Sequence, residues 1–179
     1  MLKKVTFTPV TIQILEFLAQ DPNSSFHSRD VARSARVSSG AASLTLRKLQ
    51  RAQLLSMEKK GKMKFYRVDL SNPVSRQFKV LFNLQALGGL LEALKEDTDR
   101  AILFGSCAEG TDAKDSDMDL FILTQDDARV KDILRMFRNK LHRNLSPIIV
   151  DGESLTRLRK EDKALHESIS RGIILWQRE

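Results

Sequence analysis

Apolar residues recur at helical spacing in three segments of the first fifty residues. The first, residues 10–19, has Thr8 as a plausible cap and Pro9 in its first turn, which predicts a helix. A short second helix is predicted from Ser28, as a cap, through Ser34. After a tight turn, Ala42, Leu46 and Leu49 repeat every three or four positions and predict a third helix.

The pattern then changes to that of a β-hairpin. Residues 54–69 contain two strand-like runs, and the second alternates through Met63, Phe65 and Arg67. The Lys60–Lys62 segment, with Gly61 at its centre, predicts the turn between them. The expected order is therefore three helices followed by a basic hairpin.

The second half alternates between strand and helix patterns. Residues 73–97 predict linker helices, which the pair Gly88 and Gly89 interrupts or kinks. Apolar runs at 101–104 and 120–123 predict buried strands. A helix is expected from about Asp127 to Leu141, and a further strand over 145–151.

Charge separates the two halves. Residues 1–75 carry 13 Lys and Arg against 5 Asp and Glu, whereas residues 76–179 carry 17 against 18. A basic first half beside a nearly neutral second half indicates that one segment meets a polyanion, with nucleic acid as the leading candidate. No apolar run approaches the roughly 20 residues of a membrane span, and the lone Cys107 cannot form an internal disulfide. We therefore expect a cytoplasmic protein with no membrane partner.

The segment from Ser28 to Asp69 resembles the winged helix-turn-helix of small bacterial and archaeal transcription regulators. The resemblance implies that the third helix enters the major groove of double-stranded DNA and that the hairpin, or wing, contacts the backbone or the minor groove. A basic face can also serve only solubility, and a winged helix can dock proteins. A homodimer on two half-sites is left open. The residues expected at DNA are Ser38, Ser39, Ser43, Arg47 and Lys48 on the helix, and Lys59, Lys60, Lys62 and Lys64 on the wing.

The segment between the two predicted buried strands, residues 105–119, carries the chemistry. Gly105 lets backbone N–H groups approach a phosphate, and the Ser106 hydroxyl adds a donor. Asp117 and Asp119 lie two apart on an extended segment, so both carboxylates are expected on one side. Two such carboxylates repel unless a cation lies between them, and Mg²⁺ suits a site of one or two carboxylates completed by phosphate oxygens and water.

This pattern of Gly105, Ser106, Asp117 and Asp119 resembles the active-site motif of the DNA polymerase beta-like nucleotidyltransferases, over about residues 98–176. The resemblance implies that Gly105 and Ser106 hold a nucleoside triphosphate and that both aspartates bind Mg²⁺. It also implies attack by an acceptor hydroxyl on the α-phosphorus, with pyrophosphate leaving. Members usually add a third carboxylate from a neighbouring strand; here that position falls near Ser146 or Pro147, which leaves Asp151 as the nominee.

The sequence thus predicts an α+β protein. The domains expected are a winged helix-turn-helix domain over 1–72, linker helices over 73–97 and a nucleotidyltransferase-fold domain over 98–179, with a mixed sheet flanked by helices. One hypothesis is a DNA-binding transcription regulator whose second domain binds Mg-NTP and transfers a nucleotidyl group. The alternative makes that domain a non-catalytic nucleotide sensor or protein-interaction module, and a third joins the protein to a toxin–antitoxin pair.

Overall fold

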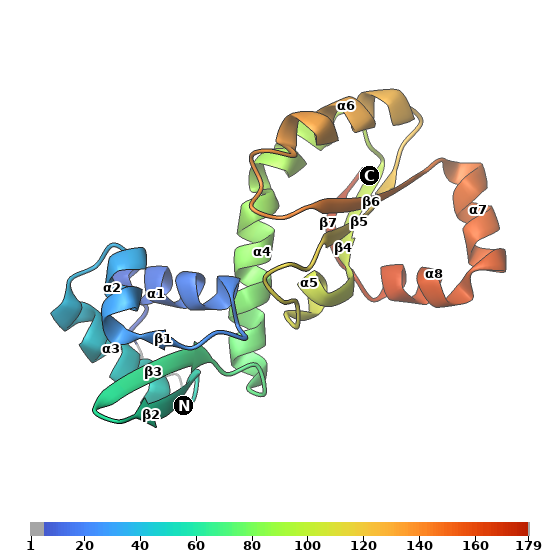
Figure 1. The fold of residues 1–179 in the computed structure, drawn as a ribbon. Coiled ribbons are helices and arrows are strands. Elements are labelled where there is room, and N and C mark those ends of the chain that lie inside the picture. Colours follow the sequence, from blue (N-terminus) through green and yellow to red (C-terminus); the bar gives the residue numbers. More distant parts are fainter. Residues whose placement is uncertain (1–5, 179) are drawn as a thin grey trace. The chain divides into compact units, whose positions relative to one another are not determined.

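The computed structural model describes residues 6–178 of the chain and has an α+β architecture (Figure 1). Contacts divide the chain into two compact units, residues 1–79 and 80–179. Each unit has its own core and is described by itself. None of the helices in the described part combines the length and the apolar character that a membrane span requires.

The first unit contains three helices and a small antiparallel sheet. Its elements, before the long helix that follows, are α1 (Pro9–Gln20), β1 (Phe26–His27), α2 (Ser28–Ser34), α3 (Ser39–Arg51), β2 (Leu55–Lys60) and β3 (Met63–Val68). The sheet order is β1-β3-β2. This arrangement of helices and wing is that of a winged helix-turn-helix domain, as the sequence predicted.

Local signals explain where these helices begin. The Thr8 hydroxyl accepts a hydrogen bond from the Thr11 amide, with Pro9 in the first turn, as predicted. Ser38 caps α3 by accepting from the Ala41 amide. The prediction for α2 was wrong by one residue, because the imidazole of His27 accepts from the Arg29 amide and Ser28 is already the first helical residue. The three apolar residues predicted to face inward from α3 are fully buried.

The wing turns at Gly61. Strands β2 and β3 pair from Leu55 with Val68 to Lys60 with Met63, which leaves two residues in the turn. Gly61 has a φ of +60°, a conformation that glycine adopts without a steric cost. The hairpin is thus a short ribbon whose tip carries exposed lysines on both strands.

One helix, α4 (Pro73–Leu94), runs from the first unit into the second and is continuous through Gly88 and Gly89, so the predicted interruption is absent. Within the first unit, the buried Lys79 donates from Nζ to the carbonyl oxygen of Ala19 at 2.7 Å. That carbonyl lies in the last turn of α1, where a cation also meets the negative end of the helix dipole. This contact fastens the start of α4 to the winged helix.

The second unit is a four-stranded mixed sheet with helices on both faces. After α4 its elements are β4 (Arg100–Phe104), α5 (Gly105–Glu109), β5 (Met118–Leu123), α6 (Asp127–Phe137), β6 (Leu145–Val150), α7 (Gly152–Glu161), α8 (Lys163–Ser170) and β7 (Ile173–Gln177). The sheet order is β6-β5-β4-β7, with β5 and β6 parallel and the other pairs antiparallel.

Alternation along the central strands builds two apolar layers. Leu103, Leu120 and Ile122 pack with the second half of α4 and with α5 and α6. Residues of the opposite parity, such as Phe104 and Phe121, pack with α7 and α8. By the same alternation, Asp119 belongs to the face of Phe121, at the end of the sheet where β4 leaves and β5 begins.

Two predicted boundaries differ in this unit. Helix α6 ends at Phe137 rather than Leu141, because residues 138–143 form turns that bring the chain back to β6. The closing strand over 145–151 was predicted correctly to within one residue. Trp176 lies on β7, half buried, and donates its indole N–H to the Thr98 carbonyl oxygen at 3.3 Å.

Candidate nucleotidyltransferase site

The turn from β4 into α5 places Gly105 directly against Asp119. Gly105 has a φ of +67°, in the left-handed region, and any Cβ at this position would lie 2.5 Å from Asp119 Oδ2. Only glycine satisfies both conditions, since other residues strain at this φ and would collide with the carboxylate. The sequence predicted that Gly105 and Ser106 close the strand; in the structure both already belong to α5, and both are half buried.

The two aspartates flank the first residue of β5. Asp117 immediately precedes the strand and is exposed, whereas Asp119 lies within it and is half buried. Asp119 is opposite Phe104 on one neighbouring strand and opposite Ser146 on the other. Strand pairing on both sides therefore fixes the backbone of Asp119 beside the Gly105 turn.

The neighbouring strand supplies a hydroxyl where relatives of this motif are expected to carry a third acid. Ser146 pairs with Asp119, so its side chain shares that face of the sheet. Asp151 follows Val150, which pairs with Leu123. It therefore lies about 16 Å from Ser146 along the strand, at about 3.3 Å per residue. The structure does not bring Asp151 to Asp117 and Asp119.

Asp151 has a different local role. Its carboxylate caps α7 by accepting from the Ser154 amide at 2.8 Å, and this hydrogen bond lowers the pKa of Asp151 below its ordinary value of 3.8. Among residues 6–178, no group of three or more His, Cys, Asp or Glu side chains is arranged to hold a metal ion. Of the predicted acids, Asp119 lies against the Gly105 turn, and Asp117, two residues earlier, is linked to α5 through its carbonyl oxygen and Cys107.

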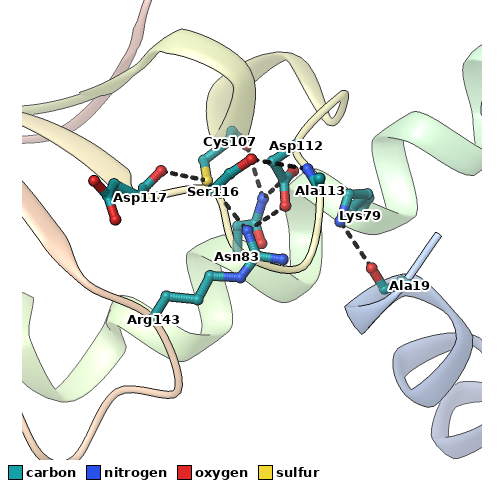
Figure 2. Close-up of polar contacts among 9 residues, drawn as sticks. All are labelled: Ala19, Lys79, Asn83, Cys107, Asp112, Ala113, Ser116, Asp117 and Arg143. Atoms are coloured by element: carbon teal, nitrogen blue, oxygen red, sulfur yellow. Dashed lines mark hydrogen bonds and ion pairs between the residues drawn. The ribbon is translucent and has the colours of Figure 1, made fainter. Parts of the chain in front are cut away.

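A buried polar network lies behind the site (Figure 2). Asp112 is fully buried and forms an ion pair with Arg143, which is 13% exposed. Asn83 of α4 donates to the Asp112 carboxylate at 3.1 Å and to the Cys107 carbonyl oxygen at 2.9 Å. The Cys107 thiol donates to the Asp117 carbonyl oxygen at 3.4 Å and lies 3.5 Å from Arg143 Nη1. Figure 2 shows the Asp117 carboxylate pointing away from this network.

An open cavity of about 270 Å³ adjoins the segment that leads to Asp117. Its walls come from residues 114–116 and from the turns after α6, and they include three basic side chains besides a histidine. The lining residues are Lys114, Asp115, Ser116, Arg138, Leu141, His142, Arg143 and Asn144. The cavity is polar and of a size that admits a small anionic group.

The residues predicted to meet DNA are arranged on α3 and on the wing of the first unit. Ser39, Arg47 and Lys48 are exposed on α3, and Ser43 is half buried. The Ser38 hydroxyl is engaged as the helix cap, although the residue itself is exposed. All four wing lysines are exposed, and Lys60 forms an ion pair with Glu58 at 3.4 Å. Leu44, 49% exposed between these polar residues, is an apolar position that the sequence analysis did not single out.

Sequence reasoning missed Asn83, Asp112 and Arg143. In the sequence, Asp112 does not differ from the other polar residues of its loop, and Arg143 is one of several basic residues after α6. Local patterns carry no signal for a pair 31 residues apart, because only tertiary contacts bring the two together. The sole hint is that Asp112 lies inside the segment that links the Gly-Ser turn to the two aspartates.

Parts of the chain are similar to known proteins. Residues 90–179 match the family model described as polymerase beta, nucleotidyltransferase. Among solved structures, AF1382 from Archaeoglobus fulgidus is similar at 16% identity, with 47% of this chain and 94% of that chain covered and a TM-score of 0.38. The homodimeric winged helix-turn-helix DNA-binding domain of Mb0332 from Mycobacterium bovis is similar at 23% identity, covering 44% and 68%, with a TM-score of 0.37. No curated protein matched the chain.

Proposed function

The chain belongs to the polymerase beta nucleotidyltransferase family, and from this membership we propose that its second unit binds a magnesium–nucleoside triphosphate and transfers the nucleotidyl group to an acceptor hydroxyl. We further propose that its winged helix binds double-stranded DNA, so that the protein acts as a transcription regulator carrying an enzymatic domain.

One observation carries the catalytic proposal: the approach of Gly105 to Asp119. A phosphate-binding turn is useful to this chemistry only if it lies beside the acids that hold the metal. Here the position of a Cβ on Gly105 would be 2.5 Å from the Asp119 carboxylate, so the two halves of the motif are in contact. The pairing of Phe104 with Asp119 is the structural cause, because it brings the end of β4 to the start of β5.

The donor set fits a divalent cation of the magnesium type. Asp117 and Asp119 would hold the ion, with phosphate oxygens and water completing its shell, as is usual for Mg²⁺ in proteins. When bound, the ion would supply neutralisation of charge on the phosphates. Gly105 would admit the triphosphate close to the backbone, and the Ser106 hydroxyl would donate to it.

The proposed reaction is a nucleotidyl transfer to the acceptor hydroxyl. The acceptor hydroxyl oxygen forms a bond to the α-phosphorus while the bond from that phosphorus to the bridging oxygen breaks. Pyrophosphate leaves and the hydroxyl proton passes to solvent. Catalysis of this kind is mainly orientation and charge stabilisation, which is consistent with a site built from a turn and two carboxylates.

Two measurements test the proposal. Calorimetry with ATP, GTP, CTP and UTP should detect Mg²⁺-dependent binding of at least one, and Asp119→Ala should abolish it. Transfer of label from the corresponding α-labelled triphosphate should then require Asp117, with Asp117→Asn inactive but still able to bind DNA. The absence of binding by all four nucleotides would overturn the proposed activity.

A second candidate function has its own support. Ser146 occupies the strand position next to Asp119 where a third acid would complete the site. A domain with two acids could retain a nucleotide without turning it over and so serve as a nucleotide sensor or interaction module. Metal-dependent nucleotide binding by a protein that transfers no label to itself or to supplied acceptors would favour this candidate.

A further inference from the structure

We infer that Arg143 and Asp112 are positioning residues for the metal-binding carboxylate of Asp117, an inference that rests on the proposed function of the same site. Neither side chain belongs to the Gly-Ser or aspartate motif. Together they form a buried ion pair that joins the loop leading to Asp117 to the turn before β6 (Figure 2).

The two charges of this pair are buried and compensate each other. The Asp112 side chain has no exposed surface and that of Arg143 has 13%. A charge removed from water is costly unless an opposite charge and hydrogen bonds compensate it. Asp112 meets both conditions, because Arg143 pairs with one oxygen and Asn83 donates to the other.

The pair reaches Asp117 through Cys107. Arg143 Nη1 lies 3.5 Å from the Cys107 sulfur, and the thiol donates to the Asp117 carbonyl oxygen at 3.4 Å. Asn83 donates to the Cys107 carbonyl oxygen as well as to Asp112. The same group of contacts therefore holds α5, the loop before β5 and the backbone of Asp117.

A second contact acts on the same peptide unit, at its N–H. The carbonyl oxygen of Asn144, the residue after Arg143, accepts from the Met118 amide at 2.9 Å. Cys107, which Arg143 contacts, and Asn144 thus hold the two edges of the peptide that joins Asp117 to Met118. Asp117 itself precedes the strand and lacks the two-sided pairing of Asp119, so its position depends on these contacts.

The inference predicts a selective defect. Loss of Arg143 should displace Asp117 while strand pairing keeps Asp119 and Gly105 in place. Residues that orient metal ligands typically contribute 10- to 100-fold in metal affinity. We expect Arg143→Gln to weaken Mg²⁺-dependent nucleotide binding by about that factor, and to leave any binding measured in EDTA unchanged.

The experiment compares Arg143→Gln with Arg138→Gln, measured by calorimetry with the nucleotide that wild type binds tightest. Arg138 lines the same cavity but is exposed, so it controls for loss of a positive charge near the site. Thermal unfolding confirms that each variant is folded. Equal weakening in both variants, or no change in either, would overturn the inference.

Two variants of Cys107 provide a second test, because leaving a buried charge unpaired in Arg143→Gln could destabilise the fold strongly. Cys107→Ala removes the link to the Asp117 carbonyl without leaving a charge unpaired, whereas Cys107→Ser retains a donor. The expected result is weaker metal-dependent binding in Cys107→Ala and partial recovery in Cys107→Ser. A purely structural role would lower the thermal midpoints without this recovery of binding.

Hydrogen exchange separates this inference from the proposed function. Peptides covering residues 111–119 should exchange faster in Arg143→Gln than in wild type, with α6 and β4 unchanged. If wild type binds no nucleotide, the proposed activity fails, and exchange alone decides whether Arg143 holds the Asp117 segment. Unaltered exchange over 111–119 would overturn the positioning role.

Discussion

At the scale of single residues, two glycines lie where the surrounding atoms leave no room for a side chain. Gly105 lies where the chain needs a positive φ and where a methyl group would occupy the space of an aspartate oxygen. Gly172 is similarly confined, since a Cβ would lie 2.6 Å from the Leu103 carbonyl oxygen, on the strand that leads to Gly105. The absence of a side chain at Gly105 therefore lets the Asp119 carboxylate lie against the turn.

Gly105→Ala tests this dependence. A Cβ would strain the backbone and push the Asp119 carboxylate aside, so Mg²⁺-dependent nucleotide binding should be lost or fall by more than about tenfold, equivalent to about 1.4 kcal/mol. Calorimetry measures the binding, and Gly40→Ala, at an open position on α3, is the control. Normal binding by Gly105→Ala would contradict the role of this turn.

At the scale of elements, the register between β5 and β6 decides the composition of the site. It places Ser146 beside Asp119 and sends Asp151 to the far end of the strand. A one-residue shift in register would have placed Pro147 or Leu145 beside Asp119 instead and turned the Ser146 side chain to the other face of the sheet. The register of β6 against β5, rather than the composition of β6, determines which side chain lies beside Asp119.

Ser146→Asp should therefore create a third carboxylate at the site. Like charges repel in the absence of a cation, so the variant should unfold at a lower temperature than wild type in EDTA and gain more stability from Mg²⁺. Thermal unfolding with and without Mg²⁺ measures both effects. Pro147→Asp adds the same charge on the other face and should show no additional response to Mg²⁺.

The start of α7 gives a prediction about pH. Because the pKa of Asp151 in the folded state lies below its ordinary value of 3.8, this group stabilises the fold above about pH 4. The contribution is lost as pH falls through the lowered pKa and the carboxylate is protonated. Asp151→Asn, which keeps a capping side chain, should match wild type at pH 7 and show less loss of stability on acidification. Thermal midpoints from pH 7 to 3 test this, and identical acid profiles would contradict it.

At the scale of the whole molecule, charge is divided between the two units as the sequence indicated. The wing concentrates exposed lysines, whereas the nucleotidyltransferase unit carries acids and bases in nearly equal number. Phosphate contacts made by lysine release counterions, so DNA affinity should fall steeply with salt. This division lets DNA binding and nucleotide chemistry be tested by separate variants of one chain.

We expect Lys62→Gln and Lys64→Gln each to reduce the slope of log affinity against log salt by about 0.9, the value for one phosphate contact. Lys160→Gln, on the exposed surface of α7, changes net charge equally and should leave the slope unaltered. Fluorescence anisotropy with duplex DNA across a salt series measures the slopes. A salt-independent affinity in wild type would contradict DNA binding by the wing.

The sequence by itself determined the types of element and the α+β class of the fold. Helical periodicity identified α1 and α3, and alternation identified the wing, because these signals depend only on nearby residues. The Gly-Ser pair and the two aspartates could be predicted as a candidate site, because each pair has a chemical meaning at short spacing. The end of α6 and the exact cap of α2 were misjudged, because competing local hydrogen bonds decide such boundaries.

Only the tertiary structure decided which distant residues meet. Ser146 became the neighbour of Asp119 through strand register, and Asp112 became the partner of Arg143 across 31 residues of sequence. Neither contact could be predicted from periodicity in the sequence, because each involves a single side chain from each segment. Burial supplied the physical reason: the enclosed Asp112 carboxylate, which accepts from Asn83 of α4, required a cation, and the turn before β6 provides Arg143.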